Sequence, residues 1–369
     1  MRKIFSLFAA LTLSVGLWAT NTTVADLAGL QTALASEVDT VFVSQTVSLT
    51  NGTTIDAKGK VISVLKPFMA ETGMIAEESS DYSVFNVEGT VSIANATILG
   101  GNGYAWSNAG GINVNPGAQL TMENVTVARS YRGIYIAGTA ILRNCDIVRN
   151  VCDFGGGILV ENGCKLIMDG CSLSENRSLS NNGGGGAMEI RSGAVLYANN
   201  TVIANNSSSE IGGAINLNQG TVYLTNCTIS GNTNQTGGGA EAGAGIGINY
   251  GILYAANCIF MNNTFFDPNT EEPTISDIGF YWSTGSASLI NCIYGGVVRG
   301  FPTQENCKVA TNSDAVFAGY RQDGVFRLTN AQTPGYKHSI LTRKEGGTFF
   351  SLSMLLHNNS AERAALLHT

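Results

Sequence analysis

Histidine is absent from the first 337 residues. All three histidines of the 369-residue chain, His338, His357 and His368, lie at its C-terminal end. The body of the chain therefore has no imidazole for a zinc site, a Ser-His-Asp triad or a Cys-His pair. Any chemistry there must use carboxylates, Arg, Lys, Tyr or Cys.

Charge and proline are also scarce. Only 13% of the residues are charged, about half the usual share, and the formal net charge is −7 with 20 basic residues spread thinly. We expect no nucleic-acid partner, because such a chain offers no positive stripe for a phosphate backbone. Six prolines beside 45 glycines exclude a collagen-like or proline-rich disordered chain.

Long hydrophobic runs are missing after the N-terminus. Arg2 and Lys3 precede an apolar run over residues 4–19, which has signal-peptide length and is short for a membrane span. We predict a signal peptide at residues 1–19, and an uncleaved anchor is the alternative. The mature chain is then expected to be extracellular or on a bacterial outer surface, without a transmembrane segment.

The dominant feature that is present is a repeat with spacings of 20 to 34 residues. Each copy has a β-type pair, an Asn, any residue, a β-type residue and an apolar residue, as in Leu224-Thr-Asn226-Cys-Thr-Ile229. The Asn of this phrase falls at Asn95, Asn124, Asn144, Asn200, Asn226, Asn257 and Asn291, and Gly170 replaces it in one copy. Three residues after the phrase, a second Asn recurs at Asn150, Asn176, Asn206, Asn232 and Asn263. Glycines followed by a short alternating strand separate the phrases.

Such periods, with short strands and no amphipathic helical repeat, predict an all-β fold, a single-stranded parallel β-helix. Coils stack about 4.8 Å apart, so equivalent side chains lie above one another. We expect the phrase asparagines to form a structural ladder, with Asn200 and Asn226 as buried inner members, and Asn234 to lie in a variable loop. A β-propeller with short blades is the alternative architecture.

The two ends depart from the repeat. Residues 24–34 carry apolar residues at helical spacing and predict a short helix that caps the first coil. The repeat degenerates around residues 313–336, where apolar side chains are expected to close the other end: Phe317, Tyr320, Val325, Phe326 and Leu328. We therefore predict a β-helix domain with caps over residues 20–336 and a C-terminal tail of unknown structure over residues 337–369.

Five of the eight cysteines directly follow the recurring position, at Cys145, Cys171, Cys227, Cys258 and Cys292. Strand alternation points this position inward, which favours an interior column of small apolar side chains. A disulfide remains the alternative in an exported chain, and Cys152 with Cys164 is then the expected pair. A straight column cannot converge on a metal ion.

One pairing of motifs resembles a known repeat. Gly-Gly-Ala-Ile with a downstream Phe-x-x-Asn is similar to the repeat of the chlamydial polymorphic membrane proteins, and residues 212–215 and 260–263 match it literally. More broadly, residues 25–336 resemble bacterial right-handed parallel β-helix surface proteins. The resemblance implies a right-handed helix and an exported, surface-associated, adhesin-like protein.

Alternation along the glycine-led strands places two columns of side chains outward. Glu161, Glu189 and Arg191 form the charged cluster of that face. Exported β-helix enzymes of the pectate-lyase-like kind use carboxylates, Ca²⁺ and an Arg or Lys base on such a face, so these three residues are the candidate catalytic groups. A surface salt-bridge ladder has the same pattern. The candidate sugar contacts are Tyr135, Asn216 and Asn218.

Two functions follow from these features. The first is a non-catalytic, monomeric surface or secreted β-helix for adhesion or scaffolding, with no cofactor and with surface glycans or host-cell components as partners. The second is a polysaccharide lyase or glycoside hydrolase that acts on an acidic polysaccharide, with Ca²⁺ in the lyase case.

Overall fold

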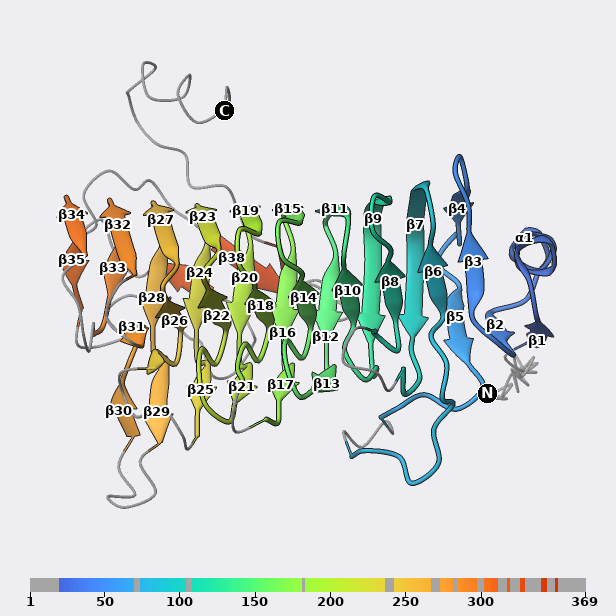
Figure 1. The fold of residues 1–369 in the computed structure, drawn as a ribbon, viewed down its shortest axis with the longest axis horizontal. Coiled ribbons are helices and arrows are strands. Elements are labelled where there is room, and N and C mark those ends of the chain that lie inside the picture. Colours follow the sequence, from blue (N-terminus) through green and yellow to red (C-terminus); the bar gives the residue numbers. More distant parts are fainter. Residues whose placement is uncertain are drawn as a thin grey trace, which may run out of the picture.

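In the computed structural model the chain winds into a long parallel β-helix, whose coils follow one another along a single axis (Figure 1). The structure describes residues 20–69, 74–103, 108–180, 183–235, 242–266, 273–281, 285–296 and 302–310, together with four short strands after residue 316. The predicted all-β solenoid is confirmed.

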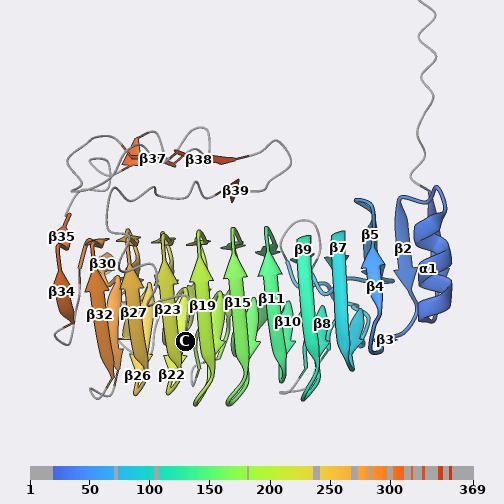
Figure 2. The same cartoon turned by 90° about the horizontal axis from the view of Figure 1, so that it is seen from above.

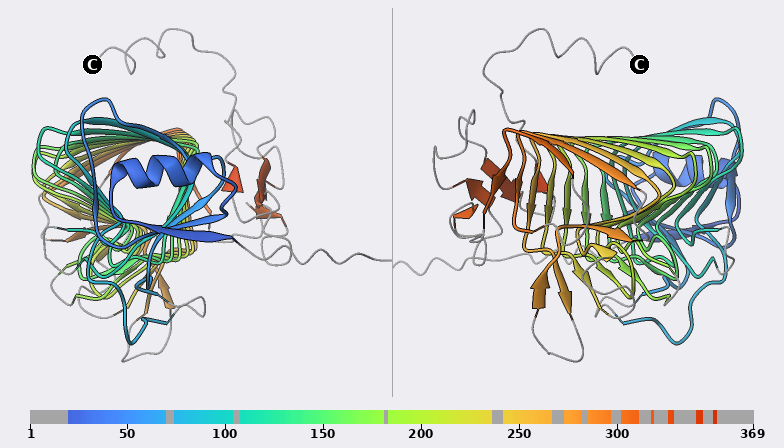
Figure 3. Two further views of the ribbon diagram at one scale, coloured as in Figure 1. Left: turned by 90° about the vertical axis from the view of Figure 1, so that its right-hand side faces the viewer. Right: turned by 60° about the vertical axis from the view of Figure 1, so that its left-hand side comes forward.

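The N-terminal end is closed by a helix, as predicted. Strand β1 (Asn21–Val24) pairs with β2 (Thr40–Val43), and α1 (Leu27–Ala35) lies across the end of the first coils (Figure 3). The Asp26 side chain accepts a hydrogen bond from the Gly29 N–H, which satisfies one donor of the first turn. The helix begins at Leu27 rather than at Val24, because Val24 belongs to β1.

One side of the coils is a nine-stranded sheet, called here the glycine-strand sheet because glycines precede most of its strands. Its members are β3 (Val47–Leu49), β6 (Phe85–Val87), β8 (Ile112–Val114), β10 (Ile134–Ile136), β14 (Ile158–Val160), β18 (Met188–Ile190), β22 (Ile215–Asn218), β26 (Ile246–Asn249) and β31 (Ile278–Tyr281).

The repeating phrase builds a 20-stranded sheet in two rows, separated by the turn at the recurring Asn. The first row, seen side by side in Figure 2, holds β4 (Thr54–Asp56), β7 (Thr90–Leu99), β9 (Gln119–Ala128), β11 (Thr139–Arg143), β15 (Lys165–Asp169), β19 (Val195–Asn199), β23 (Thr221–Thr225), β27 (Ile252–Ala256), β32 (Ser286–Ile290) and β34 (Thr303–Glu305). The second row holds β1, β2, β5 (Val61–Val64), the second halves of β7 and β9, β12 (Asp146–Val148), β16 (Ser172–Ser174), β20 (Val202–Ala204), β24 (Thr228–Ser230), β28 (Ile259–Met261), β33 (Ile293–Tyr294) and β35 (Lys308–Val309).

Shorter strands complete the chain. A six-stranded sheet contains β13 (Val151–Cys152), β17 (Arg177–Ser178), β21 (Ser207–Ser208), β25 (Thr233–Asn234), β29 (Thr264–Phe266) and β30 (Pro273–Ile275). Four antiparallel strands follow: β36 (Phe317–Ala318), β37 (Phe326–Leu328), β38 (Ile340–Arg343) and β39 (Phe349–Phe350). The predicted signal peptide and most of the predicted tail lie outside the described residues, as do Tyr320 and Val325 of the predicted closing group.

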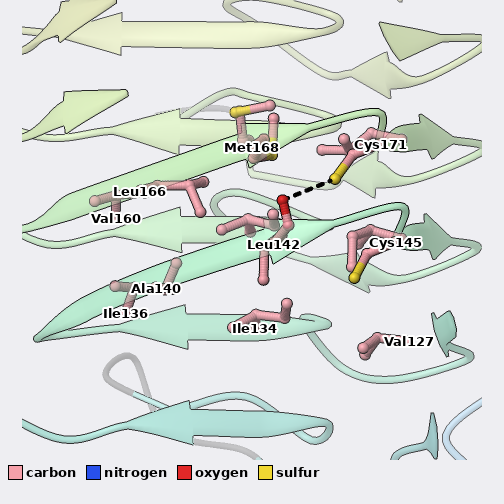
Figure 4. Packing of buried hydrophobic residues seen from close by; sticks show 14 of the residues in the cluster. Val127, Ile134, Ile136, Ala140, Leu142, Cys145, Val160, Leu166, Met168 and Cys171 are labelled. Atoms are coloured by element: carbon pink, nitrogen blue, oxygen red, sulfur yellow. Dashed lines mark hydrogen bonds between the residues drawn. The ribbon is translucent and has the colours of Figure 1, made fainter. Parts of the chain in front are cut away.

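The core is a stack of aligned apolar side chains inside the coils. Leu142 in β11 is the register partner of Met168 in β15, and both point to the interior shared with Ile134 (Figure 4). In-register parallel pairing repeats this arrangement from coil to coil, so one continuous apolar cluster runs from Leu30 to Tyr294. No helix in the described residues is long and apolar enough to cross a membrane.

The recurring asparagines occupy a left-handed turn between the two rows. Their φ angles lie between 49° and 55°, and Gly170 has a φ of 64° at the equivalent place. Asn and Gly tolerate this conformation best, which explains the choice of residue. Among the seven, Asn257 is buried, Asn124 and Asn144 are exposed and the others are half-buried. The expected burial of Asn200 and Asn226 is therefore wrong, although several of these amides bond to a neighbouring coil.

The buried ladder is built by the second Asn of the repeat. Asn206 donates from Nδ2 to Asn232 Oδ1 at 2.9 Å and accepts on Oδ1 from Asn176 Nδ2 at 3.0 Å. The same bond recurs along the column from Asn150 to Asn263, and all five members are buried. Asn234 is also fully buried, on β25, so its expected place in a variable loop is wrong.

The cysteine column is confirmed as interior. Cys145, Cys171, Cys227, Cys258 and Cys292 are buried in the core, and all eight cysteines are free thiols. No bridge joins Cys152, which packs in a separate small cluster with Tyr131, to Cys164. Asn306, with a φ of 51°, and the following Cys307 form a further copy of the phrase that the sequence analysis missed.

Candidate functional site

Glycine-rich loops fold back over the outer face of the glycine-strand sheet. Gly185 has a φ of 78° and Gly212 a φ of 60°, and a Cβ at either would lie 2.1 or 2.0 Å from a carbonyl oxygen of the strand that follows. Only glycine fits at these two positions. The loops cover the outward column of side chains that contains Glu189 and Asn216, so Glu189 is only 3% exposed and Asn216 is buried. The expectation that this column faces solvent is wrong.

The structure brings the three charged candidates together. Glu161 directly follows β14, and Arg191 directly follows β18, its neighbour in the sheet. Arg191 donates from Nη1 to Glu161 Oε1 at 2.5 Å and from Nε to Glu189 Oε1 at 3.3 Å. One guanidinium therefore holds both carboxylates, and it is the more accessible part of the cluster.

Burial dominates the electrostatics of this cluster. Desolvation raises the pKa of Glu189, and Arg191 opposes the rise. Arg132, which precedes β10 two coils earlier, also lowers the pKa of Glu189 through its positive charge. The sequence did not point to this residue. Its side chain is fully buried and donates to the backbone carbonyls of Phe154 and Asn108. The sequence carries no signal for this role of Arg132, because the backbone oxygens of Phe154 and Asn108 lie in loops of the neighbouring coils.

The candidate sugar contacts lie around the same cluster but are not free to act together. Tyr135 is half-buried, with the Arg132 guanidinium 5.9 Å from its ring centroid. Burial, and then the Glu161 charge, raises the pKa of Tyr135. Asn216 is covered by the loops, and Asn218 accepts a hydrogen bond from Asn249 Nδ2 at 3.2 Å. Tyr135 is thus tied to the charged cluster, and Asn218, which forms an amide pair with Asn249, also lowers the pKa of Glu189 through a side-chain hydrogen bond.

The arrangement is suited to holding coils together rather than to proton transfer. A general base needs an accessible carboxylate in reach of its substrate, whereas Glu161 and Glu189 are already paired with Arg191. The cluster does not fit Ca²⁺, because the Arg191 guanidinium already bonds to one oxygen of each carboxylate and would repel a calcium ion beside it. Across the described ranges, no group of three His, Cys, Asp or Glu residues is placed to hold a metal ion.

A second polar site ends the buried ladder. Asp277 accepts on Oδ1 from Asn263 Nδ2 at 2.7 Å and on Oδ2 from the Gly295 and Gly296 N–H groups at 2.6 and 2.9 Å. Desolvation raises the pKa of this fully buried carboxyl to about 6, and the hydrogen bonds limit the rise. Asp277 thereby joins the ladder to the turn that leads into the last coil.

The outer face of the first row carries a column of three tyrosines, of which Tyr254 is exposed. Tyr197, Tyr223 and Tyr254 occupy the same position of β19, β23 and β27 and form one stack. Sequence alternation places them outward, but their register, and hence the stack, follows only from the structure.

Comparison with known proteins agrees with the coil architecture. A family model described as "Right handed beta helix region" matches residues 83–360. No curated protein matches the chain. Among solved structures, the chain is similar to pectate lyase Pel9A at 13% identity, with a TM-score of 0.43 and coverage of 93% of this chain and 98% of that one.

Two further solved structures are similar at the same low level. Full-length tailspike protein 2 from Escherichia coli O157:H7 bacteriophage CAB120 has 11% identity, a TM-score of 0.36 and coverage of 90% of this chain and 49% of that one. Pectate lyase Bsp165PelA from Bacillus sp. N165, solved with trigalacturonate, has 12% identity, a TM-score of 0.30 and coverage of 79% and 90%.

Proposed function

Because the chain belongs to the right-handed β-helix family, we propose that it is an exported, surface-associated β-helix that binds its partner without chemically changing it. The Glu161–Arg191–Glu189 network, in which one guanidinium bonds to an oxygen of each carboxylate, is the observation that carries the proposal. The carboxylates that a lyase or glycosidase would need are both bonded to one guanidinium, and Glu189 lies beneath the glycine-rich loops.

Two features of the sequence support export and a place at a surface. The apolar run over residues 4–19 has signal-peptide length. The repeat resembles that of the chlamydial polymorphic membrane proteins at residues 212–215 and 260–263. Regular polar and aromatic columns along the outside of a rigid solenoid provide an extended surface for adhesion.

A turnover assay tests the absence of catalysis. The purified protein is incubated with acidic polysaccharides, with and without Ca²⁺, while the absorbance of unsaturated products and the release of reducing ends are followed. We expect neither signal above that of heat-inactivated protein. Sustained turnover that Glu189→Gln abolishes would assign the cluster to catalysis and contradict the proposal.

A further inference from the structure

The tyrosine stack on the first row follows the helix axis. The ring centroids of Tyr197 and Tyr223 are 4.9 Å apart with planes at 7°, and those of Tyr223 and Tyr254 are 5.0 Å apart with planes at 11°. These separations equal the rise of about 4.8 Å between neighbouring coils. Each coil therefore adds one ring to the stack, and each ring has one face turned towards the next coil.

The two ends of this stack differ. At the N-terminal end, Lys165 Nζ lies 5.8 Å from the Tyr197 centroid and closes the stack with a cation–π contact. At the other end, the register partner of Tyr254 in β32 is Ser288, whose side chain is too small to cover a ring. Tyr254 is 43% exposed. The last ring of the stack, Tyr254, therefore has one face that no ring covers, and the side chain next to that face in β32 is the small Ser288.

The surroundings of that face carry little charge. Register places one exposed carboxylate there, because Glu305 of the next coil is the partner of Ile290. Strands β19, β23, β27 and β32 contain no Asp, Glu, Lys or Arg over four consecutive coils. Ile252 and Ile290, each 38% exposed, flank Tyr254, and Ser286 and Ser288 bring hydroxyl groups. An acidic ligand would lose hydration here without gaining a cationic partner from these four strands. The surface is complementary to an uncharged, amphipathic ring that bears hydroxyls.

We propose that the free face of Tyr254 binds a pyranose unit of an uncharged glycan, which takes the place of a fourth ring above Ser288. The C–H face of the sugar packs on the aromatic ring, and its hydroxyls face Ser286, Ser288 and water. This assignment rests on the proposed function and names its ligand class. Uncharged glycans are favoured over acidic polysaccharides because the four strands offer no cation and the exposed Glu305 carboxylate would repel an acidic sugar.

Glycan-array binding of four variants beside wild type tests the assignment. Tyr254→Ala removes the stacking face, and Ser288→Tyr fills the sugar position while it extends an existing stack. Both should weaken binding to the retained neutral glycans by about tenfold or more. Tyr254→Phe keeps the ring and should bind like wild type. Thr121→Tyr is the matched control, because it occupies the same strand position on β9, several coils away from the stack.

Each outcome decides the assignment. Binding to neutral glycans that Tyr254→Ala and Ser288→Tyr weaken and Thr121→Tyr preserves supports it. Three results overturn it: binding to acidic glycans only, binding to neutral glycans that Tyr254→Ala leaves unchanged, and no binding on the array. A dimer that sedimentation detects and Tyr254→Ala dissociates would make a second copy the occupant and also overturn it. The turnover assay is independent of these binding results. The absence of catalysis in the proposed function can therefore be contradicted or supported whatever the array shows.

Discussion

Asparagine has two distinct structural uses in each coil. Asn144 holds a left-handed turn on the exposed side, with a φ of 50°, whereas Asn206 is a buried member of the hydrogen-bonded ladder. Both kinds recur with the same period, so the sequence predicts a ladder but does not say which Asn builds it. The two kinds differ in whether the Asn side chain points into the coil or towards solvent, and only the fold determines this.

Substitution separates these two uses. Asn206→Ala leaves Asn176 without the acceptor for its N–H and Nδ2 groups, in a site closed to water. We expect a loss of about 3 kcal/mol in the free energy of unfolding. Asn144→Gly keeps the left-handed turn and should change the free energy of unfolding by less than about 0.5 kcal/mol. Urea denaturation midpoints compare the two, and equal losses would contradict the assignment of the ladder.

Asp277 makes the end of the ladder sensitive to pH. Its pKa in the folded protein is raised to about 6 from an ordinary value of 3.8, so the folded state binds the proton more tightly than the unfolded state. The contribution of Asp277 to stability is complete below pH 3.8 and is lost as the pH rises through about 6. The full effect is about 3 kcal/mol.

Measurement of the denaturation midpoint between pH 4 and 8 in wild type and Asp277→Asn checks this effect. The amide cannot ionise, so the stability advantage of wild type over the variant should shrink as the pH rises. Other titrating groups act equally on both proteins and cancel in the difference. Parallel pH curves would show that the Asp277 carboxyl does not titrate in this interval.

At the scale of elements, strand alternation gives the inner and outer faces of each strand but not the loops that cover them. Ile112, Ile134 and Ile158 are interior, as alternation predicts. The outward Glu189 is nevertheless buried, because the loop before its strand turns back over the sheet and covers it. The left-handed backbone conformation of Gly185 allows this turn. A loop of this kind has no periodic signature, so the covered face of the candidate site could not be predicted.

Glycine substitution tests the folded-back loop. Gly212→Ala combines an unfavourable φ of 60° with a Cβ 2.0 Å from the Ile215 carbonyl oxygen. We expect a loss of about 2–4 kcal/mol in the free energy of unfolding. Gly163→Ala has a similar φ of 71° but nothing within 4 Å of its Cβ, so it should cost only about 1–2 kcal/mol. Thermal melting compares them, and a smaller loss at Gly212 would refute the close approach.

The cysteine column makes a separate prediction about thiol reactivity. In the native protein, only the half-buried Cys164 and Cys307 should react quickly with a thiol reagent, because the other six are buried. All eight thiols should react after denaturation without reductant. If four or fewer thiols per chain react under those conditions, the protein contains at least two disulfides. The assignment of the cysteines to an interior column of free thiols would then be wrong.

At the scale of the molecule, the repeat predicts the solenoid because coils contact only their neighbours and equivalent residues must stack. The predicted helical cap, the interior cysteine column and the all-β fold are confirmed. Function is less accessible from the sequence. Whether Glu161 and Glu189 are catalytic or structural depends on their common partner, Arg191, and on burial, which are properties of several coils together.

Binding without chemical change is the central claim, and one titration addresses it directly. A neutral oligosaccharide retained on the array is titrated into the protein in a calorimeter, and the same sample is then analysed by mass spectrometry after prolonged incubation. We predict saturable heat of binding and an oligosaccharide of unchanged mass. Fragments that accumulate with time, and that Glu189→Gln prevents, would contradict the account.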